Sequence, residues 1–131
     1  MKLPPYAAIL RAEVEYAEDG TPVLLMPFHE DVIGRPGFLQ GGAISGLLEV
    51  AAIAALHHAL AEEGPESAGA RIKPINVTID FMRGGRDHET RAAGTITRLG
   101  NRVANVEAFA WQDDRAKPIA AARMNYLIER D

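Results

Sequence analysis

The stretch GAISGLLEVAAIAALHHALAEE, residues 42–63, decides the fold. It holds no proline and is followed by the breaker pair Gly64-Pro65, so it predicts one long helix that ends there. Between Ala43 and Leu56 the apolar residues fall on nearly every side of such a helix. A helix of this kind is typical of a protein interior, so we expect other elements to enclose it.

Runs with strand periodicity on both sides of the helix supply these elements. The turn pairs Asp19-Gly20, Gly100-Asn101 and Asp113-Asp114 separate some of them. The order strand, strand, helix and four further strands predicts an α+β fold, with an antiparallel sheet wrapped around one long central helix. A chain of 131 residues is expected to form a single domain, 1–131. The predicted strands are 6–16, 22–29, 72–83, 88–99, 102–112 and 117–129.

The strands also carry a packing pattern. One face of the strand 72–83 is apolar, with Ile75, Val77, Ile79 and Phe81, and its other face carries Asn76, Thr78 and Asp80. Small residues alternate along the last two strands, so we expect the helix to approach the sheet closely there. These small residues are Ala104, Ala108, Ala110, Ala120 and Ala122.

Composition excludes several classes of function. The chain has no cysteine, which rules out disulfides, cysteine-based metal sites and a thiol nucleophile. The net charge is −4, basic residues are scattered and aromatic residues are few, so no nucleic-acid partner is expected. The N-terminus lacks a signal-peptide pattern, and no segment looks long and apolar enough, without charge, to cross a membrane. A cytoplasmic protein with no membrane partner is expected.

The segment Gly37-Phe38-Leu39-Gln40-Gly41-Gly42, followed by a helix with an acid at Glu49, resembles the signature of hotdog thioesterases of the phenylacetic-acid-degradation type. Segments 77–83 and 98–103 are also similar to that family, and the resemblance covers roughly residues 20–128. The resemblance implies a hotdog fold that hydrolyses acyl-CoA, with CoA as part of the substrate and no other cofactor. It also implies a homodimer or homotetramer.

The residues themselves point to the same region. Gly42 and Glu49 lie seven apart, hence on one helix face, with Ser45 between them. A paired glycine at the start of a helix leaves N–H groups free at the positive end of its dipole. The resemblance assigns catalytic roles to Glu49, to the Gly41 N–H as oxyanion donor and to Gln40 beside it, and Gly42 and Ser45 would touch the substrate. It also implies that the glycine and the acid come from different subunits.

Four positions depart from the family pattern. Glu49 stands for the usual Asp, Gln40 for His, Gly34 for Asn, and Pro74 for Ser or Thr. A carboxylate at position 49 could attack the thioester directly or activate a water, and the sequence leaves both routes open. It also leaves open a non-catalytic acyl-CoA binder, a carrier-protein thioester as ligand, and a structural dimerisation module, for which Glu49 has no evident purpose.

Arginines are the candidates for binding the phosphates of CoA. Arg83, Arg86, Arg98 and Arg102 lie at strand ends and turns, and arginine suits bidentate contact with phosphate. By resemblance to related proteins, the turn between Arg98 and Arg102, with Asn101, would approach the nucleotide end of CoA. We therefore expect Arg83, Arg98, Asn101 and Arg102 to bind substrate.

Other chemistries find less support. His57 and His58 are adjacent, not four apart as on a zinc-binding helix, so no metal site is expected. No Gly-x-Ser-x-Gly elbow occurs in the chain. In hotdog dehydratases a His stands some fourteen residues before the helical acid; that position is Arg35 here, and His29 lies six residues too early. A hydro-lyase is therefore a weaker alternative than a thioesterase.

Overall fold

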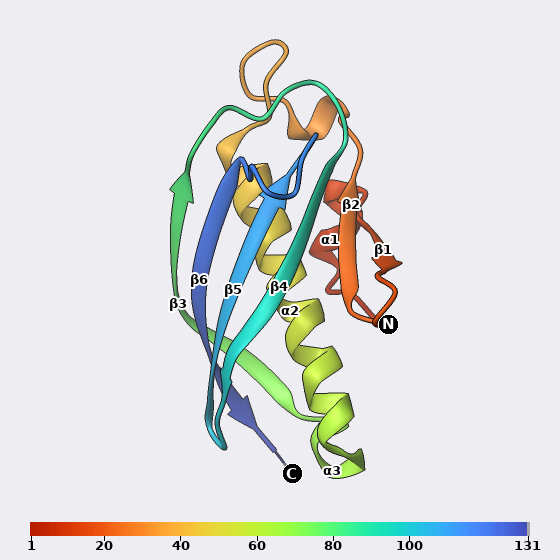
Figure 1. Ribbon diagram of the computed structural model, residues 1–131, viewed down its shortest axis with the longest axis vertical. Coiled ribbons are helices and arrows are strands. Elements are labelled where there is room, and N and C mark those ends of the chain that lie inside the picture. The colour runs from red at the N-terminus through yellow and green to blue at the C-terminus, as the bar shows by residue number, and fades with distance from the viewer. Residues whose placement is uncertain (131) are drawn as a thin grey trace.

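The structure is a computed structural model that describes residues 1–130. Within these residues a six-stranded antiparallel sheet curves around the long helix α2, Gly41–Glu63 (Figure 1). The order of strands across the sheet is β1-β2-β4-β5-β6-β3. This confirms the predicted α+β fold with one central helix. The strands are β1 Glu13–Tyr16, β2 Pro22–Met26, β3 Arg71–Phe81, β4 Thr90–Leu99, β5 Val103–Trp111 and β6 Ala120–Glu129.

Small residues set the spacing between α2 and the sheet. The predicted alanines of β5 and β6 are all buried, from Ala104 at 0% to Ala122 at 3% exposed. In β4, a Cβ added at Gly94 would lie 2.9 Å from the Ala55 Cβ and 3.1 Å from the Ala51 carbonyl oxygen of α2. The backbones of helix and strand therefore approach so closely that only glycine fits at this position.

The predicted strand 6–16 is wrong in its first half. Tyr6–Leu10 forms the short helix α1, and only Glu13–Tyr16 is a strand. Ala7 and Leu10, three apart, are buried against the core, which a helix allows and an alternating strand does not. Arg11, with φ 55°, ends α1 in the left-handed conformation.

The other predicted elements are correct in type and differ at their ends. The second strand stops at Met26, because Glu30–Val32 forms a 3₁₀ helix, and a further short helix, α3 (Pro65–Ala68), follows Gly64. Neither short helix has enough periodicity to be read from the sequence. The remaining observed bounds are Gly41–Glu63 for 42–63, Arg71–Phe81 for 72–83, Thr90–Leu99 for 88–99, Val103–Trp111 for 102–112 and Ala120–Glu129 for 117–129.

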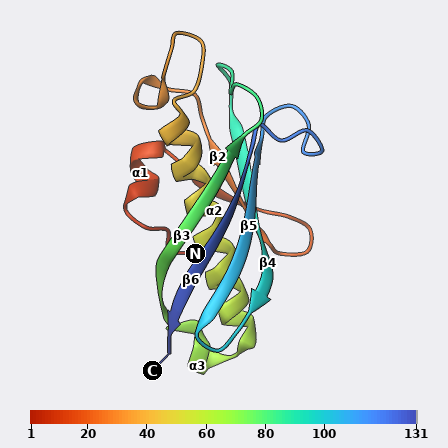
Figure 2. The same cartoon turned by 90° about the vertical axis from the view of Figure 1, so that its left-hand side faces the viewer.

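Helix α2 is not enclosed on all sides, contrary to the sequence-based expectation. Gly42 and Glu49 are exposed, and Ser45, Ile53 and His57 are only half-buried. These five residues recur at helical spacing and form one stripe, which we call the open face of α2. In Figure 2 the helix is visible between α1 and β3, and these two elements leave this side uncovered.

Strand β3 forms the edge of the sheet beside this open face. Its apolar side chains are largely uncovered in the single chain: Ile75 is 54%, Val77 50% and Phe81 55% exposed. A register shift between Pro74 and Asn76 marks a bulge, and proline is tolerated on an edge strand because it lacks an N–H donor. The chain thus presents a long apolar edge strand, a template for pairing with another chain.

One expectation about α2 itself also needs correction. By length and composition, Gly41–Glu63 would pass as a membrane span, with a mean hydropathy of 1.6 in its most apolar window. Glu49 alone does not disqualify it. In the structure 61% of that window is buried inside the fold, as in the core helix of a globular domain.

The contact between α2 and β4 gives a test of the fold. Gly94→Ala is expected to lower the free energy of unfolding by about 1–3 kcal/mol, because the new Cβ meets backbone that has no room to move. The control is Gly69→Ala, where a Cβ meets nothing within 4 Å. Denaturation followed by Trp111 fluorescence measures both; equal stability of the two variants would show that the spacing is not fixed here.

Candidate active site

The first turn of α2 presents two backbone donors. The Gln40 carbonyl accepts from the N–H groups of Ala43 (3.0 Å) and Ile44 (3.2 Å), which closes the helix behind Gly41 and Gly42. Within residues 1–130, no side-chain or turn acceptor receives the N–H of either glycine. These donors point out of the positive end of a 23-residue helix, an arrangement that favours a negatively charged oxygen.

Ser45 supports this turn. Its hydroxyl donates to the Gly41 carbonyl at 2.9 Å, one turn back along the helix. In this arrangement the hydroxyl is engaged with backbone and does not orient Glu49. The structure therefore brings Ser45 to the paired glycines, as the spacing indicated.

The end of β3 lies against the start of α2. A Cβ added at Gly41 would lie 3.6 Å from Cζ of Phe81, so the phenyl ring covers this glycine. The next residues are held by hydrogen bonds from the N–H groups of Met82 (2.8 Å) and Arg83 (3.2 Å) to the Ile119 carbonyl. Arg83 is thereby placed at the same end of the molecule as the glycine donors.

Two departures from the family pattern depend on each other. A Cβ at Gly34 would lie 2.9 Å from the Gln40 Oε1 and 3.0 Å from the Gln40 Cα. Any side chain at position 34 would therefore collide with Gln40 as it stands. The Gln40 amide fills space that an Asn at position 34 would need, so an amide is still present beside the paired glycines.

Glu49 lies on the open face of α2 with its carboxylate exposed. Among the described residues it makes no hydrogen bond or ion pair. Burial raises the pKa of the Tyr126 hydroxyl beneath the helix, and the Glu49 carboxylate raises that pKa further. Glu49 and Gly41 are eight positions apart in the helix, about 12 Å along the axis at 1.5 Å per residue. Within one chain, about two turns of helix therefore lie between the acid and the donor.

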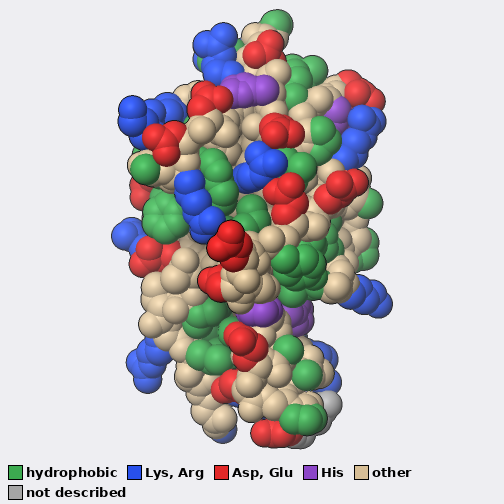
Figure 3. Space-filling model, turned by 45° about the vertical axis from the view of Figure 1, so that its right-hand side comes forward, with side chains coloured by type: hydrophobic (Ala, Val, Ile, Leu, Met, Phe, Trp, Pro, Cys, Tyr) green, Lys and Arg blue, Asp and Glu red, His purple; other side chains and the backbone are tan. Residues whose placement is uncertain are grey.

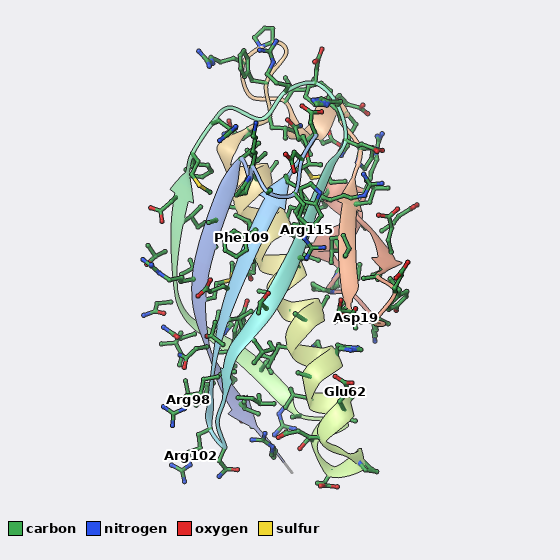
Figure 4. The ribbon with its side chains drawn as sticks, viewed as in Figure 1. Asp19, Glu62, Arg98, Arg102, Phe109 and Arg115 are labelled. Atoms are coloured by element: carbon green, nitrogen blue, oxygen red, sulfur yellow. The ribbon has the colours of Figure 1, made fainter. Side chains whose placement is uncertain are left out.

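The basic hairpin lies elsewhere. Figure 4 shows Arg98 and Arg102 at the β4–β5 turn, at the end of the molecule where α2 finishes. With Asn101 they line a shallow cavity, and the Asn101 carbonyl accepts a hydrogen bond from Arg130. The structure thus separates these three predicted substrate-binding residues from Gly41 within one chain, whereas Gly42, Ser45 and Arg83 lie at the same end as Gly41.

Two aromatic residues of this region escaped the sequence analysis. Phe81 was read only as an apolar strand residue, yet it covers Gly41. Tyr6 of α1 packs on Gly46, where a Cβ would lie 2.7 Å from its ring. A glycine inside a helix often marks such a close approach, and this was the available signal for Tyr6.

No metal centre is evident in the part of the chain that the structure describes, since no group of three or more His, Asp or Glu side chains gathers there. His58 instead lies 3.4 Å from Glu62, one turn along α2. His57 lies on the open face, four and eight residues after Ile53 and Glu49.

The helix, the strand order and the open edge together define a hotdog fold. Residues 36–119, more than half of the chain, match the thioesterase superfamily, and the chain belongs to that superfamily. It is 26% identical over 133 residues to the medium/long-chain acyl-CoA thioesterase YigI of Salmonella typhimurium. The aligned region covers 95% of this chain and 85% of that protein.

Solved structures share the fold. A Chromobacterium violaceum protein is 33% identical to this chain and superposes with a TM-score of 0.72. The match covers 94% of this chain and 82% of the Chromobacterium chain. A Bacillus halodurans protein crystallised with CoA reaches a TM-score of 0.80 at 20% identity, covering 98% of this chain and 80% of its own. The second likeness is one of fold.

The open face yields a pH prediction through His57, whose pKa is lowered by burial. The folded chain binds this proton less tightly than the unfolded chain, whose histidine pKa is about 6.5, so acidification favours unfolding. The contribution of neutral His57 to folding stability is complete above about pH 6.5, and it is lost as the pH falls through the lowered pKa of His57. His57→Gln should lose less stability than wild type between about pH 7.5 and 5, measured by urea denaturation. Identical pH slopes would contradict the assignment.

Proposed function

We propose that this protein hydrolyses the thioester of an acyl-CoA, with the Gly41 N–H as oxyanion donor and the Glu49 carboxylate as general base or nucleophile. The observation that carries the proposal is a pair of groups that have no partner within residues 1–130: backbone donors at the start of α2 and a carboxylate on the same open face. Membership of the thioesterase superfamily supports the reaction class. CoA belongs to the substrate, and no separate cofactor is needed.

The site requires two copies of the chain. Because Glu49 lies about 12 Å along α2 from Gly41, a carbonyl on one donor needs the carboxylate of a second copy. The exposed apolar edge of β3, next to the open face, is the surface suited to this pairing. A homodimer joined along β3 would bury Ile75, Val77 and Phe81; a homotetramer would add a second contact. The symmetry of a dimer gives two equivalent sites.

The chemistry follows from this arrangement. The thioester oxygen accepts from the Gly41 N–H, which stabilises the charge that develops when the carbonyl is attacked. Glu49 either removes a proton from the attacking water or attacks the carbonyl carbon itself, giving an anhydride that water then cleaves. Either route ends with a carboxylic acid and the CoA thiol. The Gln40 amide, packed on Gly34, is placed to hold the water or the carbonyl.

The acyl class is part of the proposal. The curated relative is named for medium- and long-chain acyl-CoAs, so these are the first substrates to try, followed by aromatic acyl-CoAs of the phenylacetic-acid-degradation type. A cytoplasmic location, where acyl-CoA is available, belongs to the same proposal. The outer ends of the acyl pocket would be formed by both copies, so one chain does not define its length.

Replacement of the acid is the first test. Glu49→Gln removes the base and nucleophile while it keeps the side-chain volume, and kcat for thiol release is expected to fall about 100-fold or more. Acyl-CoA binding, measured by calorimetry, should remain. The control Glu62→Gln changes an exposed acid on the same helix and should retain wild-type turnover.

A different outcome would redirect the proposal. If wild-type protein releases no thiol from any acyl-CoA but still binds these compounds, the chain is an acyl-CoA binding protein. The altered positions Gln40, Gly34 and Pro74 are the observation that favours this second candidate function.

The oxyanion donor can be tested by removing the Gly41 N–H. Proline is favoured at the first position of a helix, and Gln40, with φ −67° and ψ 134°, has the conformation that precedes proline. Gly41→Pro therefore deletes the N–H without breaking α2, and kcat should fall on the order of 100- to 1000-fold. Gly41→Ala keeps the N–H, and its Cβ meets Phe81 at 3.6 Å, so its loss should be much smaller. Equal losses would point to crowding instead of the donor.

The same variants test the two-chain site. When Glu49→Gln and Gly41→Pro proteins are unfolded together and refolded, a mixed dimer has one site with both intact groups. Activity should reappear in the mixture although each parent is inactive. A mixture as inactive as its parents would place the acid and the donor in the same chain.

A further inference from the structure

The ring of Phe38 carries two arginines. The guanidinium carbons of Arg35 and Arg86 each lie 4.6 Å from the centroid of this one ring. Two like charges are thus gathered on one aromatic side chain three residues before Gly41. We call these three residues the arginine clamp.

The backbone beneath the clamp is fixed. The Leu39 N–H donates to the Gly85 carbonyl at 2.9 Å, and a β-bridge pairs Phe38 with Arg86. Gly84 makes room for the ring, since a Cβ there would lie 3.1 Å from it. The two loops that supply the arginines are therefore joined to each other, and the clamp is held ready without a ligand.

Carboxylates do not compensate the clamp. Within residues 1–130, neither Arg35 nor Arg86 forms an ion pair, whereas Arg11, Arg91 and Arg130 pair with Glu30, Glu15 and Glu63. On the face of the molecule drawn in Figure 3, acidic and basic side chains likewise lie among one another. The adjoining cavity adds the cations Arg83 and Lys117, and the acids Asp113 and Asp114. Asp113 lies 3.7 Å from His88, and Asp114 accepts from the Ala116 N–H.

We propose that the arginine clamp binds the phosphates of the CoA whose thioester lies at Gly41. This inference rests on the proposed function. A guanidinium that stacks by its face keeps its in-plane N–H groups free, and these match phosphate oxygens in pairs. Phosphate also relieves the repulsion between the two arginines.

The position of the clamp suits the shape of CoA. Arg35 and Gly41 are six positions apart in the chain, so the two lie at most about 20 Å apart. The extended pantetheine arm spans a distance of this order between thioester and pyrophosphate. In the same chain Arg98 and Arg102 lie at the opposite end of α2 (Figure 4), so the clamp is the cationic group nearer to this oxyanion site.

Comparison of two substrates with one acyl group tests the clamp. The double variant Arg35→Gln/Arg86→Gln should raise KM for acyl-CoA about tenfold or more, since each arginine supplies charged hydrogen bonds. The KM for the acyl-N-acetylcysteamine thioester, which has no phosphate, should not change. The control Arg115→Gln/Arg123→Gln removes the same charge, including an arginine stacked on Trp111 at 4.5 Å, and should leave both KM values unchanged.

Each remaining outcome decides the matter. If the clamp variant Arg35→Gln/Arg86→Gln leaves KM for acyl-CoA unchanged, the clamp proposal is overturned. If KM for acyl-CoA rises only in the variant Arg98→Gln/Arg102→Gln, the phosphates bind at the hairpin of a neighbouring copy. If wild type hydrolyses neither thioester, the proposed function fails, and calorimetry with adenosine 3′,5′-bisphosphate then tests the clamp alone. The clamp proposal is supported if the clamp variant loses binding of adenosine 3′,5′-bisphosphate and the control Arg115→Gln/Arg123→Gln keeps it. Equal binding by both variants overturns the proposal.

Discussion

The close approach of α2 to the sheet is the constraint on which the rest of the structure depends. Alanines on β5 and β6 and Gly94 on β4 let an apolar helix lie nearly backbone to backbone with the strands. Eleven residues of this helix are buried in the core of the fold. The position of Gly41, and therefore of its N–H, is a consequence of that packing.

The sheet covers α2 on one side only. Because β3 continues the sheet beyond the helix, the open face and the apolar β3 edge lie next to each other and face away from the core. A single chain leaves apolar area and an acid exposed, and within the described residues no side-chain or turn acceptor receives the two backbone donors. Association of two copies would cover the apolar area and bring the acid of one copy to the backbone donors of the other. The stability of the assembly and its chemistry would then depend on the same surface.

The departures from the family pattern are easier to understand in the structure than one at a time. Gly34 lies against Gln40, whose side-chain oxygen and backbone leave no room for a Cβ at position 34. Pro74 lies at the bulge of an edge strand, where a missing N–H leaves no gap in the ladder. These substitutions preserve the architecture around the first turn of α2.

The sequence by itself determined the long helix, the later strands and the alanine faces, and it pointed to the paired glycines and Glu49 as candidate site residues. Those features are local: periodicity, breakers and spacing are properties of neighbouring residues. The sequence-based prediction failed at α1, because burial of Ala7 and Leu10 against α2 overrides an alternating pattern. It also wrongly predicted that other elements enclose α2 on all sides. Only the tertiary structure decided which stripe of α2 stays open, that Phe81 covers Gly41, and that Arg35 and Arg86 meet on Phe38. Each of these depends on contacts between residues far apart in the chain, which no spacing encodes.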